Sequence, residues 1–159
     1  MDESASADWD TFERSLADVL SVLTEDQYLV LSRKRGTAYV QFAAQGAWGM
    51  RAETVSDNYL PPAEDLSHVQ VAALTVLGWS DPTGSAEEGN PTEQPGGSPN
   101  YFRDFSSPVV WGDVARFAVR TFREVHQVPH PGNLNYSSFD SEKRTILLPT
   151  LRLKHRSPS

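Results

Sequence analysis

The chain has 159 residues, no cysteine and a formal net charge of −7, from 14 Lys and Arg against 21 Asp and Glu. This length is sufficient for an ordinary hydrophobic core, and the missing cysteines exclude disulfides, thiolate metal ligands and a cysteine nucleophile. The acidic charge disfavours nucleic acid and anionic membranes as partners, because both carry negative charge themselves.

The N-terminus and the basic residues bear on location and partners. Residues 1–4 include two acids where a secretory signal needs positive charge, and no apolar stretch approaches the ~20 residues that span a bilayer. We therefore expect a cytoplasmic protein that binds neither nucleic acid nor membrane. Its only basic runs are short: Arg33-Lys34-Arg35 at a predicted turn and Lys154-His155-Arg156 at the C-terminus.

An amphipathic helix is the first predicted element. Its start is capped by Asp8, or by Asp10 in a capping box with Glu13. The apolar residues that follow recur at helical spacing. They are Trp9, Phe12, Leu16, Val19, Leu20 and Leu23.

Three short segments of alternating apolar residues follow and predict an antiparallel β-meander. They cover residues 28–31, 37–42 and 48–55, with turns near Gly36 and Gly46. Strand alternation places Tyr39 and Gln41 together on one face of the second strand, and Arg51 and Glu53 together on one face of the third.

The second half of the chain predicts two more helices and a long loop. A helix from Asp65 or Ser67 should end at Gly78, with Trp79 folding back on its end. Residues from about 80 to 100 are rich in Gly, Pro and Ser and predict a mobile surface loop. The aromatic residues of 101–105 should close the core.

The last predicted helix is capped by Ser107, has Pro108 at its first position and runs to about His126. Beyond it, Leu134, Tyr136 and Phe139 and then the segment 145–149 read as an extended element that is a candidate edge strand, followed by an extended C-terminal tail of about 140–159. With no internal repeat and no second core, residues 1–159 are expected to form a single α+β domain.

The sequence contains no recognisable catalytic or cofactor motif. No serine lies in a nucleophile elbow, and no glycine-rich segment has the order that cradles phosphate. His126 and His130 form the closest histidine pair, but Pro129 between them argues against chelation from one helix. We expect no metal, no cofactor and no enzymatic activity, and interpret His126 as a cation-capable residue near a helix C-terminus, where the helix dipole favours positive charge.

Aromatic and charged residues on the predicted strands are the candidates for binding a partner. Tyrosine and tryptophan offer large contact area at low entropic cost, although core packing is the simpler interpretation of each tryptophan. A surface ion pair is likewise the simpler interpretation of Arg51 with Glu53. The candidate partner-binding residues are Tyr39, Gln41, Trp48, Arg51, Glu53 and Tyr59.

Four segments in order resemble the actinobacterial TY-Chap family of type III secretion chaperone-like and YbjN-like domains. They are 39–42, 51–56, 59–62 and 77–79, and the helical segments that begin at Trp9 and Val114 fit the same pattern, so the resemblance covers roughly residues 8–140. It implies an α-β-β-β-α core with a further helix, and a role as a peptide-binding chaperone or adaptor.

Three hypotheses for function follow. The first is a non-enzymatic module that holds a protein or peptide partner through the sheet face or an edge strand. The second is a structural subunit that works as an oligomer, for example a homodimer. The third is an enzyme in which Arg51, Glu53 and a histidine converge in a cleft.

Overall fold

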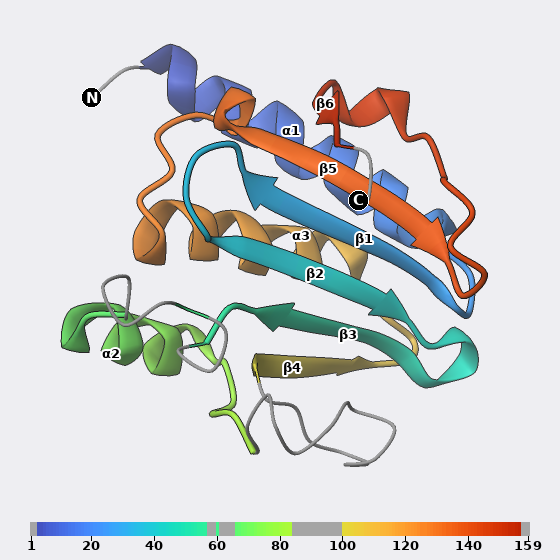
Figure 1. Ribbon diagram of the computed structural model, residues 1–159, viewed down its shortest axis with the longest axis horizontal. Coiled ribbons are helices and arrows are strands. Elements are labelled where there is room, and N and C mark those ends of the chain that lie inside the picture. Colours follow the sequence, from blue (N-terminus) through green and yellow to red (C-terminus); the bar gives the residue numbers. More distant parts are fainter. Residues whose placement is uncertain (1–2, 57–59, 61–65, 84–99, 157–159) are drawn as a thin grey trace.

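The computed structural model describes residues 3–56, 60, 66–83 and 100–156, and its centre is a six-stranded sheet. The strand order is β4-β3-β2-β1-β5-β6, and all neighbours are antiparallel except the parallel pair β5–β6 (Figure 1). The strands are β1 (Gln27–Arg33), β2 (Tyr39–Ala44), β3 (Gly49–Thr54), β4 (Tyr101–Ser106), β5 (Leu134–Asp140) and β6 (Lys154–His155).

Two helices cover one face of this sheet and a third stands at its end. Helices α1 (Glu3–Val22) and α3 (Trp111–Arg120) pack against each other behind the strands, and a π-helical turn, Thr121–Val125, continues α3 (Figure 1). Helix α2 (His68–Leu77) contacts that π-helical turn. The predicted α+β fold with N-terminal, middle and C-terminal helices is confirmed.

Strand alternation builds the core on the helix-covered face. In β1, β2 and β3 every second side chain points toward α1 and α3, and each fully buried one contributes about 1.5–3 kcal/mol. The strand residues of this core are Leu29, Leu31, Val40, Phe42, Met50 and Ala52. The predicted meander is therefore present, and its register is set by which alternate side chains are apolar.

Helix α2 begins and ends as its sequence predicts. The Ser67 side chain accepts a hydrogen bond from the Gln70 amide, and the Gln70 side chain accepts one from the Ser67 amide, which is a capping box. Gly78 ends the helix at φ 116°, and the Trp79 amide donates to the Leu74 carbonyl at 3.0 Å. Trp79 folds back into the core, where its indole donates to the Thr121 hydroxyl.

The second half of the chain meets some expectations and corrects others. The aromatic residues of 101–105 join the core, with Tyr101 buried and Phe105 packed against it, and they do so from strand β4. Helix α3 begins at Trp111 rather than at Pro108, because β4 continues to Ser106. The extended element expected at Leu134–Phe139 is strand β5, paired with β1, whereas Thr145 forms a single bridge to Phe139. The C-terminal stretch is not a free tail, since Leu148 and Leu151 are buried and β6 joins the sheet.

The predicted 80–100 loop lies largely outside the described residues. Of its described part, Ser80 exchanges two backbone hydrogen bonds with Phe102 on β4. This bridge ties the chain after α2 to the edge of the sheet.

Candidate functional site

Four of the six predicted partner-binding residues lie together on the sheet face opposite α1 and α3. Tyr39 and Gln41 come from β2, Arg51 and Glu53 come from β3, and Gln41 lies directly across from Glu53. Trp48 lies apart, in the 3₁₀ turn that joins β2 to β3, with 81% of its surface exposed.

The remaining predicted binder, Tyr59, is outside the described residues.

Arg51 is engaged in the structure rather than free on the surface. Its guanidinium donates to both Asp104 carboxylate oxygens, at 2.7 and 2.9 Å, and stacks 4.9 Å above the Phe102 ring centre. The hydrogen bond to Asp104 raises the pKa of Arg51 above its ordinary value. With only 7% of Arg51 exposed, this pair fastens β3 to β4.

Glu53 belongs to a second buried group centred on Asn100. The Asn100 amide donates to Glu53 at 3.4 Å, and its carbonyl oxygen accepts from the Tyr39 hydroxyl at 3.2 Å and from the Ser56 amide at 3.3 Å. Glu53 is 6% exposed. The group therefore fixes the tyrosine ring beside the sheet through its hydroxyl.

A groove opens where the face of the sheet meets the turn between β1 and β2. Tyr39 and Gln41 line it together with Val30 and Ser32 of β1, and its volume is about 310 Å³. We call it the sheet groove. Its size is at the lower end of ligand-binding pockets, which suits one or two side chains of a bound segment.

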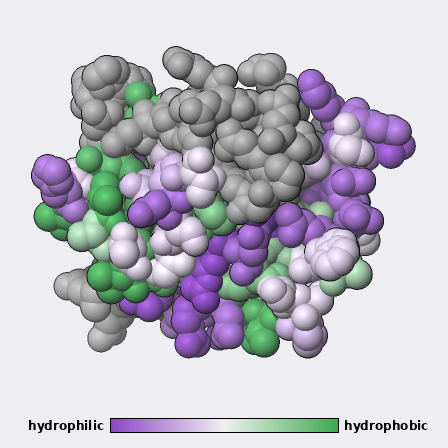
Figure 2. All heavy atoms as spheres, turned by 90° about the horizontal axis from the view of Figure 1, so that it is seen from below, coloured by the Kyte–Doolittle hydropathy of each residue, from purple (hydrophilic) through white to green (hydrophobic). Residues whose placement is uncertain are grey.

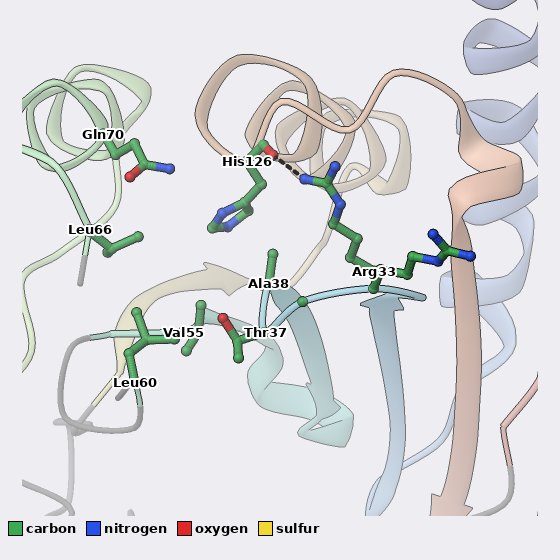
Figure 3. Close-up of a pocket in the computed structure, with 10 residues that line it drawn as sticks. Arg33, Thr37, Ala38, Val55, Leu60, Leu66, Gln70 and His126 are labelled. Carbon is green, nitrogen blue, oxygen red and sulfur yellow. Dashed lines mark hydrogen bonds between the residues drawn. The ribbon is translucent and has the colours of Figure 1, made fainter. Parts of the chain in front are cut away.

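A smaller pocket of about 200 Å³ lies on the other side of the same turn (Figure 3). It shares the turn residues 36–38 and Val55 with the sheet groove. Figure 3 shows His126 pointing into this pocket above Val55, with Leu66 and Gln70 on the α2 side. The Arg33 guanidinium donates to the His126 carbonyl at 3.0 Å and closes the opposite side.

His126 is neutral, which corrects the expectation of a cation at the helix end. Burial, together with the nearby Arg33 charge, lowers the pKa of its imidazole to about 4. The Thr54 hydroxyl donates its proton to the Tyr39 carbonyl, so it accepts from Nε2 of His126 at 2.9 Å. The imidazole therefore carries its proton on Nε2.

Arg51 and Glu53 do not converge with His126. His126 meets β3 on the helix-covered face, through Thr54, whereas Arg51 and Glu53 point to the opposite face. Nε2 of His130 lies 2.6 Å from an Asp8 carboxylate oxygen on α1. No three His, Asp or Glu residues gather into a metal-holding group among the described residues.

A family model described as "T3SS (YopN, CesT) and YbjN peptide-binding chaperone 3" (TY-Chap3) matches residues 2–140. The chain belongs to the TY-Chap3 family. No curated protein and no solved structure matches the chain. The TY-Chap3 match includes all three helices and strands β1 to β5, and it ends before β6.

Sequence reasoning missed part of the groove of this TY-Chap3 chain. Val30 and Ser32 alternate with the buried leucines of β1, so strand alternation could have placed them beside Tyr39. Arg156 also lines the groove, and no local pattern predicts it, because it arrives through the parallel pairing of β6. In the described part of the chain, every helix is too short or too polar to cross a membrane.

Proposed function

We propose that this TY-Chap3 protein binds a peptide segment of another protein and holds it without changing it chemically, as a chaperone or adaptor. The observation that carries the proposal is the peptide-binding family match over residues 2–140, together with a groove formed by strands inside that match. Tyr39 and Gln41 are the proposed contacts in the groove.

Arg51 and Glu53 support this site by position rather than by contact. Their side chains are buried in the β3–β4 and Asn100 interactions, so they hold the strands that carry Tyr39 and Gln41. We propose Trp48 as a separate apolar contact. Trp48 comes after the end of β2 that lies away from the groove. An extended segment that runs along β2 would reach that end of the strand about 10 Å past Gln41.

A photo-crosslinking amino acid tests the groove directly. Placed at Gln41 in the native host, it should form an adduct with a defined partner protein. The same group at exposed Arg116 on α3, behind the sheet, should not. Overlapping peptides from that partner then give the bound segment and its affinity for the purified chain.

A matched pair of substitutions makes the affinity measurement specific. Gln41→Trp fills the groove and should weaken peptide binding at least ~10-fold, which is about 1.4 kcal/mol. Arg116→Trp places the same side chain at an exposed position on α3, behind the sheet, and should bind within about 2-fold of the wild type. Equal adducts at both crosslinker positions, or chemical conversion of the bound peptide, would contradict the proposal.

Apolar side chains on α2 favour a second candidate role, assembly of two copies. Val69 is 78% exposed and Val76 is 85% exposed, with exposed Ala72 between them on the same helix face. Figure 2 shows apolar surface gathered at the end of the molecule where α2 lies. Light scattering at two concentrations tests this role, and Val69→Lys with Val76→Lys should return any dimer to monomer.

A further inference from the structure

The two basic runs, which lie at residues 33–35 and 154–156, meet at one corner of the fold. Lys34, Lys154, His155 and Arg156 line a single cavity of about 320 Å³ together with Asn135 of β5. The sequence gives no sign of this meeting, because more than a hundred residues separate the runs.

Backbone hydrogen bonds hold this corner in place. The Lys34 amide donates to the Asn133 carbonyl at 2.9 Å, and the Arg156 amide donates to the Tyr136 carbonyl at 2.7 Å. Strand β6 pairs with β5 at the same point, with Lys154 beside Asn135. The backbone of both runs is therefore hydrogen-bonded at the start of β5, which fixes the positions from which their side chains extend.

The corner continues into the sheet groove. Arg156 lines both the corner cavity and the groove with Tyr39 and Gln41, and Arg35 lines the pocket on the other side of the same turn. We call Lys34, Arg35, Lys154 and Arg156 the basic rim. The described residues that line these three hollows include no Asp or Glu.

The charges of the basic rim are not neutralised by the described part of the protein. The ion pairs there use Arg51, Arg116, Arg120, Arg144 and His130, and none uses a rim residue. The four rim charges are set in a chain of net charge −7, so the remainder of the chain carries −11. All four side chains are exposed.

Two residues of the corner each have a buried polar atom that makes no hydrogen bond among the described residues, Nε2 of His155 and Oδ1 of Asn135. Buried polar atoms usually have a partner. An imidazole N–H at Nε2 can donate to a carboxylate oxygen, whereas the Asn135 oxygen only accepts and needs a donor.

We infer that the segment held in the sheet groove is acidic and places its carboxylates against the basic rim. The inference rests on the proposed function and names the class of partner. Carboxylates beside exposed Lys and Arg form charge-assisted hydrogen bonds, and the opposite charges speed association. Val30 and Val55 in the groove add an apolar surface for a neighbouring side chain of the segment.

An acidic peptide fits this corner better than a nucleic acid does. Tight phosphate-backbone binding uses many cations along an extended path. The rim offers four at one corner, and the surrounding charge of −11 repels a polyanion that continues past it. Of the rim residues, Lys34 and Arg35 lie within the family match, and Lys154 and Arg156 lie beyond it.

Selection from a displayed library of random short peptides tests the inference. The wild-type chain should enrich peptides that contain Asp and Glu, and their affinity should fall at least ~10-fold between about 0.05 M and 0.3 M salt. The double variant Lys34→Glu with Arg156→Glu should lose the acidic enrichment and bind the selected peptides at least ~10-fold more weakly. Thermal melts establish that each variant is folded.

A matched control carries the same charge change elsewhere. Arg14→Glu with Arg116→Glu alters exposed residues on α1 and α3, on the far side of the sheet, and should leave the selection unchanged. An equal loss of acidic enrichment in this control would overturn the inference, since the loss would then follow from the change in net charge and not from the rim residues.

The remaining outcomes separate the two proposals. Enriched peptides that are neutral or basic, but are lost with Gln41→Trp, would overturn the acidic partner and leave peptide holding intact. A library that yields no binder would overturn both. A short single-stranded DNA that binds more tightly than the selected peptides, through the same rim residues, would replace the acidic peptide with a nucleic acid.

Discussion

The hydroxyl of Thr54 lies 2.9 Å from Nε2 of His126 and donates to the Tyr39 carbonyl at 2.7 Å. One side chain of β3 thus joins the end of the α3 segment to the start of β2. Tyr39 in turn lines the sheet groove, so the buried imidazole supports the strand that carries a proposed contact.

Loss of stability in mild acid should depend on His126. Its pKa is about 4 in the folded chain and about 6.5 when unfolded, so the unfolded state takes up a proton first as the pH falls. The free energy of unfolding should decrease from about pH 6.5 downward, by up to about 3 kcal/mol near pH 4.

Urea unfolding at several pH values measures this dependence. His126→Gln should remove that part of the slope, and His68→Gln, an exposed position on α2, should keep it. An unchanged slope in His126→Gln would show that other groups cause the acid sensitivity.

Substitution of two glycines should have opposite effects. A Cβ at Gly49 would lie 1.9 Å from the Phe105 carbonyl oxygen at a φ of 119°, so Gly49→Ala should cost about 3 kcal/mol or more by parting β3 from β4. Gly112, on α3, has open space around such a Cβ, and Gly112→Ala should stabilise by about 0.5 kcal/mol. Denaturant midpoints compare the two; a tolerated Gly49→Ala would refute the close approach.

Arg51→Ala should lower stability rather than act on binding alone. It leaves the half-exposed Asp104 and the buried Glu53 without their cation, a loss of about 2–3 kcal/mol. Arg116→Ala removes an exposed pair at 3.8 Å and should cost less than about 0.5 kcal/mol. If the two variants were equally stable, the buried Arg51 ion pair would contribute no more to stability than the exposed Arg116 pair, and the prediction would be wrong.

Tryptophan substitutions should separate a surface residue from a core residue. Trp48→Ala should change stability by less than about 0.5 kcal/mol, because the side chain is largely in solvent. Trp79→Ala removes a buried ring and its hydrogen bond to Thr121, at a cost of about 3–5 kcal/mol. Thermal unfolding distinguishes them, and a large loss in Trp48→Ala would contradict its exposure.

Sequence patterns correctly predicted the elements that are determined by residues close together in the chain. The meander was visible because alternate residues of β1 to β3 must be apolar to face α1 and α3. The limits of α2 were visible because Ser67 and Gly78 satisfy the backbone groups at its two ends. The same patterns placed Tyr39 with Gln41 on one face of β2 and Arg51 with Glu53 on one face of β3, and the register of β2 with β3 put both pairs on the same face of the sheet.

Partners of those residues could not be read from the sequence. Asp104 and Asn100 reach Arg51 and Glu53 only because β4 pairs with β3 across the long segment between them. A strand carries no local mark of the neighbour it will join, since the backbone donors and acceptors of all strands are alike. The burial of His126, and with it the loss of its charge, depended on the same kind of distant packing.

By itself, the sequence determined the α+β class, the absence of cysteine chemistry, the acidic charge and the resemblance to a peptide-binding chaperone family. Tertiary structure alone decided that two short basic runs form one rim. Arg33 ends β1 and is followed by Lys34 and Arg35, whereas residues 154–155 form β6 and are followed by Arg156. Both runs meet the start of β5 through backbone hydrogen bonds. Exposed charges that are far apart along a chain act together only where folding brings them within about one Debye length of each other, because salt screens longer separations.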